Sequence, residues 1–333
     1  MVVERKGKHS ESGSWMARWL ACNPAFVLWF LVSGLVCGAL VVLLLAMQVG
    51  GGGASIARAQ GTTVSGAACG SVAIAGAECV SRPIILTARQ REILAKKTAL
   101  AQEFRRVLAG KLPMAAFQHA ARQLARQFGW PAPQFSVSPF SCTDTCPPTS
   151  ASLNVVQQPQ TTNYYCGPAT VAEILKEKGI THSQGYLAGS SFLNTSSVTG
   201  TSWNPHVVPN TLNTILNTTF HVPLSGSGTG ASTPITTSIF ESDLTADIST
   251  GWPLAGNVYE PKNGLHLPGH RSNQDIWHWI AIKGYINSGA NTTYADSVYG
   301  ATSVGWYQSV TSPYYTISSS DMATLANNMG LVW

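Results

Sequence analysis

Residues 160–170 read Gln-Thr-Thr-Asn-Tyr-Tyr-Cys-Gly-Pro-Ala-Thr, and this stretch places one cysteine where a loop turns into a helix. Pro168 suits a first helical turn, and apolar residues then recur at helical spacing until Gly179 offers a stop. The stretch therefore predicts a helix over about residues 168–178, with Cys166 at its N-terminus. Unpaired backbone N–H groups and the positive end of the helix dipole favour a thiolate there, the reactive form of cysteine.

A strand predicted over residues 277–285 carries the partner that such a thiol needs. It reads Trp-His-Trp-Ile-Ala-Ile-Lys-Gly-Tyr, and alternation places His278 on one face together with two isoleucines. Asp296 follows 18 positions after the histidine. A thiol nucleophile needs a base to take its proton, and the base needs an acceptor that orients it. Cys166, His278 and Asp296 supply these three roles.

The candidate for the oxyanion hole is Gln160, which stands six positions before Cys166. Its side-chain amide can bind the substrate carbonyl oxygen together with the backbone N–H of the cysteine. Gln157 and Gln158 compete for the same role.

Asp275 is the main rival to Asp296 as the orienting acid, because it lies close to His278 in the sequence. Its odd offset of three along an extended segment points it to the opposite face, so Asp296 is preferred. The other histidines of the C-terminal half lie in polar, loop-like sequence without metal-ligand spacing, and we expect ordinary surface or turn residues. They are His182, His206, His221, His266 and His270. We expect no metal and no other cofactor.

The order of helix and strand signals indicates the fold class. Further helices are predicted over residues 207–218 and 239–248. Strands, marked by β-branched and aromatic residues between turn residues, are predicted over 252–258, 277–285, 303–308 and 314–317. Helices followed by strands predict an α+β domain with an antiparallel sheet.

The N-terminal segment predicts export. Residues 1–24 form a basic segment, expected in the cytoplasm, and residues 25–49 contain no charged side chain. Such a run is long enough to cross a bilayer as a signal anchor, which leaves the catalytic domain extracellular on a single-pass membrane protein. The small-x-small sequence ending at Ala59 offers an alternative, because cleavage there would release a secreted form.

Residues 50–129 contain two helix-like stretches, over 87–109 and 114–128, and are expected to form a helical stalk or a pro-segment. Their basic face suits contact with anionic lipid or cell-wall polymer, although a solvated face of a stalk is the simpler interpretation. This face comprises Arg89, Arg91, Lys96, Lys97, Arg105, Arg106, Arg122 and Arg126. Residues 130–152 are rich in Pro, Ser and Thr and indicate a linker, so the catalytic domain is expected over 153–333.

Charge is divided unevenly along the chain. Residues 1–150 hold 15 Lys+Arg against 6 Asp+Glu, whereas residues 151–333 hold 5 against 9. The C-terminal half therefore offers no basic surface for nucleic acid.

The cysteines agree with an oxidising compartment. Five follow the apolar run, and Cys69 with Cys79, and Cys142 with Cys146, are near enough to close short disulfide loops. This pairing leaves Cys166 as a free thiol. The alternative is a structural disulfide between Cys166 and one of the others.

Three motifs occur in order: Gln-x₅-Cys-Gly-Pro-Ala from residue 160, His-Trp-Ile-Ala-Ile-x-Gly-Tyr from residue 278, and Tyr-Ala-Asp-Ser from residue 294. Over about residues 153–317 the chain resembles the C39-like, papain-type cysteine peptidases, relatives of the domain that trims bacteriocin leader peptides. The resemblance implies a papain-like fold, in which a helix with the nucleophile packs on an antiparallel sheet with the base and its orienter. It gives these roles to Cys166, His278 and Asp296, and makes Gln160 the oxyanion donor.

The expected function is thus an exported thiol hydrolase that cleaves a peptide or amide bond of a peptide or protein substrate. One alternative is a catalytically silent cleft that binds a cell-wall peptide or a partner protein. Another is acyl transfer, such as transpeptidation, by the same thiol.

Overall fold

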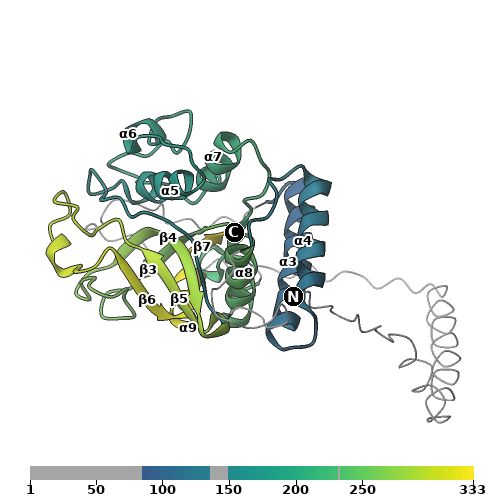
Figure 1. The fold of residues 1–333 in the computed structure, drawn as a ribbon. Helices are drawn as coiled ribbons and strands as arrows, with labels where there is room; N and C mark the ends of the chain where they lie inside the picture. Colours follow the sequence, from purple (N-terminus) through teal and green to yellow (C-terminus); the bar gives the residue numbers. More distant parts are fainter. Residues whose placement is uncertain (1–84, 136–148, 232) are drawn as a thin grey trace, which may run out of the picture. The chain divides into compact units, whose positions relative to one another are not determined.

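The computed structural model describes residues 85–135, 149–231 and 233–333 (Figure 1). The expected cytoplasmic segment, the apolar run 25–49, the cleavage site after Ala59 and the four cysteines expected to pair lie outside these residues. Among the residues described, no helix combines the length and the apolar character needed to cross a bilayer. Cys166 is a free thiol and is buried.

The described part contains helices and an antiparallel sheet. The helices are α3 (Ala88–Leu108), α4 (Met114–Phe128), α5 (Cys166–Glu177), α6 (Gln184–Leu187), α7 (Val207–Ile215), α8 (Thr237–Ser249) and α9 (Ser319–Asn327), with short 3-10 helices η1 (Ser227–Thr229), η2 (Asn287–Gly289) and η3 (Tyr307–Ser309). The strands are β1 (Ala151–Ser152), β2 (Pro223–Ser225), β3 (Leu254–Glu260), β4 (Ile276–Ile286), β5 (Asn291–Ala295), β6 (Tyr314–Ser318) and β7 (Gly330–Val332). The predicted α+β class with an antiparallel sheet is confirmed.

Strand β4 is the centre of the sheet. The described strands follow the order β2-β7-β3-β4-β5-β6, and β1 pairs with the end of β4. Ala281 of β4 lies opposite Ala295 of β5, so the next position, Asp296, shares a face with the even-numbered residues of β4. His278 is one of these residues. The register therefore brings the predicted base and its predicted orienter to the same face of the sheet.

Two differences from the sequence-based prediction concern strands. The strand expected over residues 303–308 is wrong, since this segment forms turns that lead into η3. Val304 and Trp306 are instead buried in a small cluster that includes Val298, so their apolar character reflects packing of a loop. Strand β5 was not predicted because it begins with polar residues, and it forms because β4 and β6 pair with its two edges.

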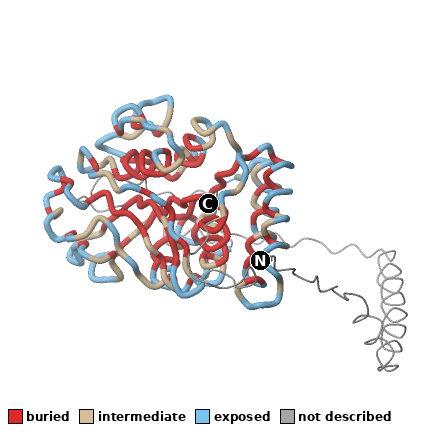
Figure 2. Tube along the Cα trace, viewed as in Figure 1, coloured by how far each residue is buried: buried red, intermediate tan, exposed pale blue. Residues whose placement is uncertain are grey.

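Helices α3 and α4, the segment expected to be a stalk or a pro-segment, share the main hydrophobic core with the rest of the described chain. Helix α3 packs against α8, and buried residues recur along it (Figure 2). The rings of Phe104 and Phe117 join α3 to α4, with centroids 4.6 Å apart. Thr87 and Gln90 fix the start of α3 through a capping box.

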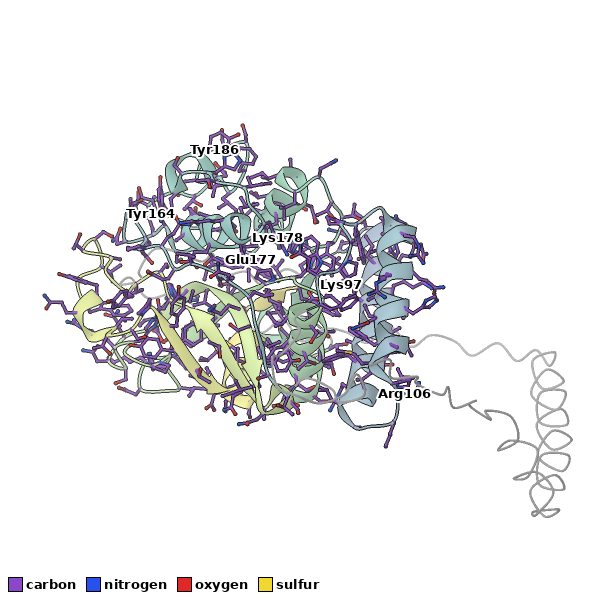
Figure 3. All side chains as sticks on the ribbon, viewed as in Figure 1. Lys97, Arg106, Tyr164, Glu177, Lys178 and Tyr186 are labelled. Atoms are coloured by element: carbon purple, nitrogen blue, oxygen red, sulfur yellow. The ribbon has the colours of Figure 1, made fainter. Side chains whose placement is uncertain are left out.

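Lys97 corrects part of the predicted basic face. Its ammonium donates to Asp247 Oδ2 of α8 at 2.9 Å and lies over the ring of Phe220, 3.4 Å from the centroid. The side chain is buried because position 97 falls on the same helical stripe as Ile93 and Ala101. Lys97 is therefore not available to lipid or polymer. Figure 3 shows Lys97 near Lys178, which follows the C-terminal end of α5, whereas Tyr164 lies at the N-terminal end of this helix.

Candidate active site

Cys166 is the first residue of α5, and its side chain is fully buried. The helix packs against β4. Among the described residues, the side chain of Tyr165 at the N-cap makes no capping hydrogen bond. The first N–H groups of a helix have no partner within it, and Cys166 stands at this positive end of the helix dipole. This local geometry suits a developing negative charge.

His278 of β4 connects Cys166 to Asp296. Its Nε2 lies 3.2 Å from Asp296 Oδ1, and its ring lies near enough to the Cys166 side chain for that side chain to raise its pKa. Because Nε2 faces the carboxylate, Nδ1 is the nitrogen available to the thiol. Asp296 Oδ1 also accepts a bond of 2.9 Å from the backbone N–H of Val298. The structure thus brings Cys166, His278 and Asp296 together in the predicted order.

The charges of this cluster outweigh the cost of burial. Burial by itself would lower the pKa of His278, but the hydrogen bond to the Asp296 carboxylate and the interaction with the Cys166 side chain together raise its pKa to about 10. Burial would likewise raise the pKa of Asp296, but the neighbouring imidazoles of His270 and His278 hold the pKa of this carboxyl well below its ordinary value. The histidine is therefore an imidazolium and the aspartate a carboxylate at neutral pH.

Gln160 is buried beside the same cluster. Its backbone N–H donates to the carbonyl of Ser297 at 2.8 Å, and its Oε1 accepts from the Ser297 hydroxyl at 3.1 Å. Its Nε2 donates to the carbonyl of Thr162 at 2.9 Å. An amide NH₂ carries two N–H groups, so this bond uses one of them. Ser297 follows Asp296 directly, and Gln160 is thereby fixed to the loop that carries the orienting acid.

The two competing glutamines are held in other ways. Gln157 Nε2 donates to the carbonyls of Asp296 and Tyr299, at 3.0 Å each, so both of its N–H groups are used. The backbone N–H of Gln158 donates to the buried carboxyl of Glu173 at 2.7 Å. Burial raises the pKa of Glu173 to about 8. These contacts position the loop before Cys166 and leave Gln160 as the better oxyanion candidate.

Asp275, the rival acid, lies apart from His278. Its Oδ1 accepts from the Tyr259 hydroxyl at 2.9 Å and from the Lys262 backbone N–H at 2.8 Å. It therefore anchors the start of the loop between β3 and β4. The acid bonded to His278 is Asp296.

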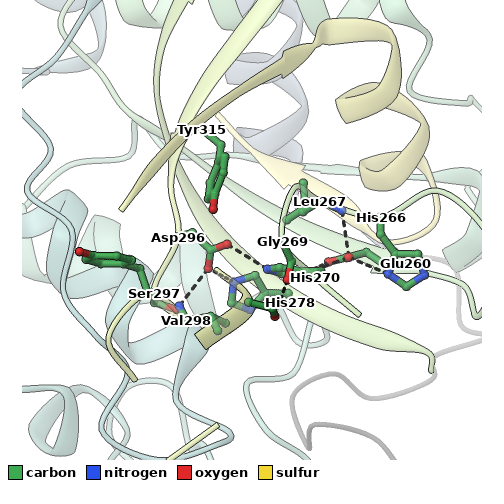
Figure 4. Close-up of polar contacts among 12 residues, drawn as sticks. Glu260, His266, Leu267, Gly269, His270, His278, Asp296, Ser297, Val298 and Tyr315 are labelled. Atoms are coloured by element: carbon green, nitrogen blue, oxygen red, sulfur yellow. Dashed lines mark hydrogen bonds and ion pairs between the residues drawn. The ribbon is translucent and has the colours of Figure 1, made fainter. Parts of the chain in front are cut away.

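Two residues that the sequence did not predict for the site, His270 and Glu260, extend the cluster around Asp296. His270 Nε2 lies 2.9 Å from Asp296 Oδ2, and His270 Nδ1 lies 2.8 Å from Glu260 Oε1 (Figure 4). The expectation that His270 is an ordinary surface or turn residue is wrong, because it is buried between two carboxylates. His206 and His221 are buried as well.

A signal for this contact was present in the sequence. Glu260 is the last residue of β3, and it lies opposite Ile276, two positions before His278 on the same face. The loop from residue 261 to residue 275 must return to this point to begin β4. A charged residue at such a strand end indicates a polar partner nearby, but the sequence does not say which histidine of the loop supplies it.

His270, His278 and Asp296 also form a grouping that resembles a metal site, since their candidate ligand atoms lie within 4.8 Å of one another. Each histidine nitrogen that faces Asp296 is at hydrogen-bond distance from it. A cation would have to replace both of these bonds.

Comparison with known proteins adds to this geometry. No curated protein matches the chain. One solved structure that does is the peptidase domain of Streptococcus ComA, described as a bi-functional ABC transporter involved in a quorum sensing pathway, at 17% identity and a TM-score of 0.33, covering 54% of this chain and 96% of that one. The family model described as "Peptidase_C39 like family" matches residues 152–320, which is half of the chain. The chain therefore belongs to the C39-like peptidase family.

Proposed function

We propose that this protein is an exported thiol hydrolase that cleaves a peptide or amide bond through Cys166, His278 and Asp296. Membership of the C39-like family supports a cysteine peptidase. The observation that carries the finer proposal is the position of His278, which bonds Asp296 after β5 and interacts with the Cys166 side chain at the start of α5. A thiol, a base and an orienting acid in this order are the parts that nucleophilic acyl transfer needs.

The proposed reaction has two halves. The Cys166 thiolate attacks the substrate carbonyl carbon, and the backbone N–H of Cys166 and the free N–H of Gln160 hold the oxyanion. The His278 imidazolium gives its proton to the leaving amine as the carbon–nitrogen bond breaks, which leaves a thioester. His278 then takes a proton from water, the resulting hydroxide attacks the thioester, and the carbon–sulfur bond breaks to return the thiolate and release the acid.

Substrate hydrolysis tests this proposal directly. Full-length wild type and Cys166→Ala are incubated with a mixture of synthetic peptides, and cleavage is followed by mass spectrometry. We expect cleavage by wild type and none by Cys166→Ala. Cleavage that survives the substitution would place the chemistry elsewhere.

A second measurement needs no substrate. The rate at which iodoacetamide alkylates Cys166, mapped by mass spectrometry, reports the thiolate. We expect wild type to react at pH 6 far faster than an ordinary thiol with a pKa of about 8.5. If Cys166 reacts as an ordinary thiol, the silent binding cleft becomes the better interpretation.

Addition of an amine to the peptide assay separates hydrolysis from transpeptidation, which would yield an amide of the added amine.

The exported, membrane-anchored location is proposed from the basic segment and the uncharged run 25–49. Membrane fractionation and N-terminal sequencing of the mature protein test it. We expect an intact N-terminus in the membrane fraction. A mature protein that begins at Gln60 would instead indicate a secreted form.

A further inference from the structure

At the second carboxylate oxygen of Asp296 the structure has a second histidine, whose ring centroid lies 5.3 Å from that of His278, and beyond it a second carboxylate. His270 Nε2 faces Asp296 Oδ2 at 2.9 Å, and His270 Nδ1 faces Glu260 Oε1 at 2.8 Å and Oε2 at 3.1 Å. The side chains of His270, Glu260 and Asp296 are fully buried. Figure 4 shows a row of contacts from Glu260 through His270 and Asp296 to His278, and this row bends at Asp296 so that the two histidine rings lie near each other.

The two contacts of His270 decide its protonation. A carboxylate accepts hydrogen bonds, and a histidine donates from both ring nitrogens only when it is protonated. A neutral ring would turn a lone pair towards one of the two carboxylates. His270 is therefore an imidazolium between two anions. Burial alone would lower the pKa of His270, but Glu260 and Asp296 together raise its pKa to about 9.

The surroundings hold this ring in place. Trp306 packs edge-on against it, with centroids 4.8 Å apart, and Glu260 Oε2 accepts from the Leu267 backbone N–H at 3.0 Å. The remaining titratable groups near Glu260, His270 and Asp296 are His266, with Nδ1 3.1 Å from Glu260 Oε2, and Cys166, Glu173, His278, Tyr294 and Tyr315.

We propose that Glu260 and His270 are positioning residues, which keep Asp296 ionised and keep its Oδ1 turned towards His278. This inference rests on the proposed thiol chemistry, and it extends the site from three groups to five. With Cys166 as the thiolate of the proposed mechanism, the charges alternate along the row: thiolate, imidazolium, carboxylate, imidazolium, carboxylate. Each ion has an opposite neighbour, which offsets the cost of burying so many charges.

The mechanism gives this arrangement a purpose. When His278 hands its proton to the leaving amine, Asp296 is left facing a neutral ring in a buried place. Without another cation, a buried carboxylate tends to take up a proton. A protonated Asp296 would no longer stabilise the imidazolium that forms when His278 takes a proton from water, so the second half of the reaction would slow. His270 supplies the second cation throughout the cycle, and Glu260 keeps His270 charged.

The test is the pH dependence of Cys166 alkylation by iodoacetamide in the full-length protein. Glu260→Gln keeps the shape of the side chain and removes its charge. We expect the rate at pH 6 to fall about tenfold, because the imidazolium of His278 is less stabilised, and the rate at pH 9 to stay within about twofold of wild type. His270→Gln, whose amide reaches one carboxylate but not both, should show the same pattern.

A double-mutant cycle with Asp296→Asn separates positioning from a general structural role. If Glu260 acts through Asp296, Glu260→Gln should change the rate less than about twofold in the Asp296→Asn background. Asp275→Asn is the matched control, because Asp275 anchors the same loop without touching the row. We expect it to react as wild type does. If Glu260→Gln does not fold, His270→Gln takes its place in the cycle.

The outcomes are distinguishable. If wild-type Cys166 alkylates as an ordinary thiol, the proposed function fails. If wild type is fast at pH 6 and both Glu260→Gln and His270→Gln match it at every pH, only the positioning role fails. An equal loss with and without Asp296 would also overturn it, because the effect would then not pass through that residue.

Discussion

Two buried groups of charges differ in how their pKa values respond to burial. One is the ion pair of Lys97 and Asp247 between α3 and α8, and the other is the row of charges beside β4. Burial lowers the pKa of Lys97 to about 8 and raises the pKa of Asp247 to about 6, and their mutual attraction only partly offsets this. In the active site, the pKa of His278 rises to about 10 and that of Asp296 falls well below its ordinary value. Burial dominates in the first region, and charge partners dominate in the second.

The number of partners explains the difference. Asp296 accepts from two imidazoliums and from a backbone N–H, whereas Asp247 bonds the ammonium of Lys97 at 2.9 Å and is attracted only weakly by that of Lys178. Asp243 lies near the same pair as a second acid, and burial raises its pKa too. A buried pair with few partners costs stability and joins two helices. A buried row with alternating charges holds its protons in fixed places, which is what proton transfer needs.

The largest expected effect is on the rate of peptide cleavage. His278→Ala removes the base and breaks the row, and we expect peptide cleavage to slow about a thousandfold, within the range typical of a general base. His182→Ala is the control, because His182 stacks on Tyr186 away from the row. Rates of peptide cleavage by the two variants make the comparison. A loss below tenfold for His278→Ala would remove this residue from the mechanism.

Next in size is the effect on stability at the other region. Lys97→Met leaves Asp247 buried without its cation, and we expect the free energy of unfolding in urea to fall by about 3 kcal/mol. Lys96→Met, one position away and exposed, should change it by less than about 0.5 kcal/mol. The alkylation rate of Cys166 should be unchanged in both.

The double variant Lys97→Met/Asp247→Leu sharpens this prediction. Replacement of a whole buried pair by apolar groups is often neutral or stabilising, so most of the loss should be recovered. If the double variant is less stable than Lys97→Met, the ion pair is not the source of the effect.

A smaller effect is expected from pH. The folded-state pKa values of His270 and His278 lie above the ordinary value of 6.5, so their contribution to stability is full below pH 6.5 and is lost as pH rises towards 9 and 10. We expect the free energy of unfolding to fall across this window, with a slope on the order of 1 kcal/mol per pH unit. Lys97 acts in the opposite sense, because its lowered pKa adds stability as pH rises above about 8.

Urea unfolding of wild type and His270→Gln at pH 6.5 and pH 9 measures this dependence. The variant should lose part of it, since one of the two imidazoliums is gone. An equal dependence in both proteins would show that His270 is not charged in the folded state.

The smallest expected effect concerns the helix start. A Cβ at Gly167, next to Cys166, would clash with the side chain of Thr201, whose carbonyl accepts from Trp279 Nε1 at 3.0 Å. We expect Gly167→Ala to cost about 1 kcal/mol, because strain of about 1–3 kcal/mol is partly offset by better helix propensity. Gly185→Ala in α6 meets no atom and serves as the control. Thermal melts of both variants test this prediction. Equal melting temperatures for Gly167→Ala and Gly185→Ala would contradict the clash.

The sequence predicts the parts of this site that depend on local pattern. Helical spacing places Cys166 at a helix start, alternation places His278 on one face of a strand, and the offset of Asp275 turns it away. The same patterns fail where packing overrides them. Trp306 looks like a strand residue and lies in a loop, and Lys97 looks like a surface cation and is buried.

What the sequence by itself determined is the class of the domain, its helix bearing the cysteine, its central strand and the order of the candidate nucleophile, base and acid, because each follows from a periodicity of a few residues. Only the tertiary structure decided that His270 and Glu260 stand behind Asp296, and that α3 is tied to α8 through Lys97 and Asp247. Such contacts join residues 10 to 150 positions apart. They are selected by the total free energy of packing and of buried charge, which no short window of sequence contains.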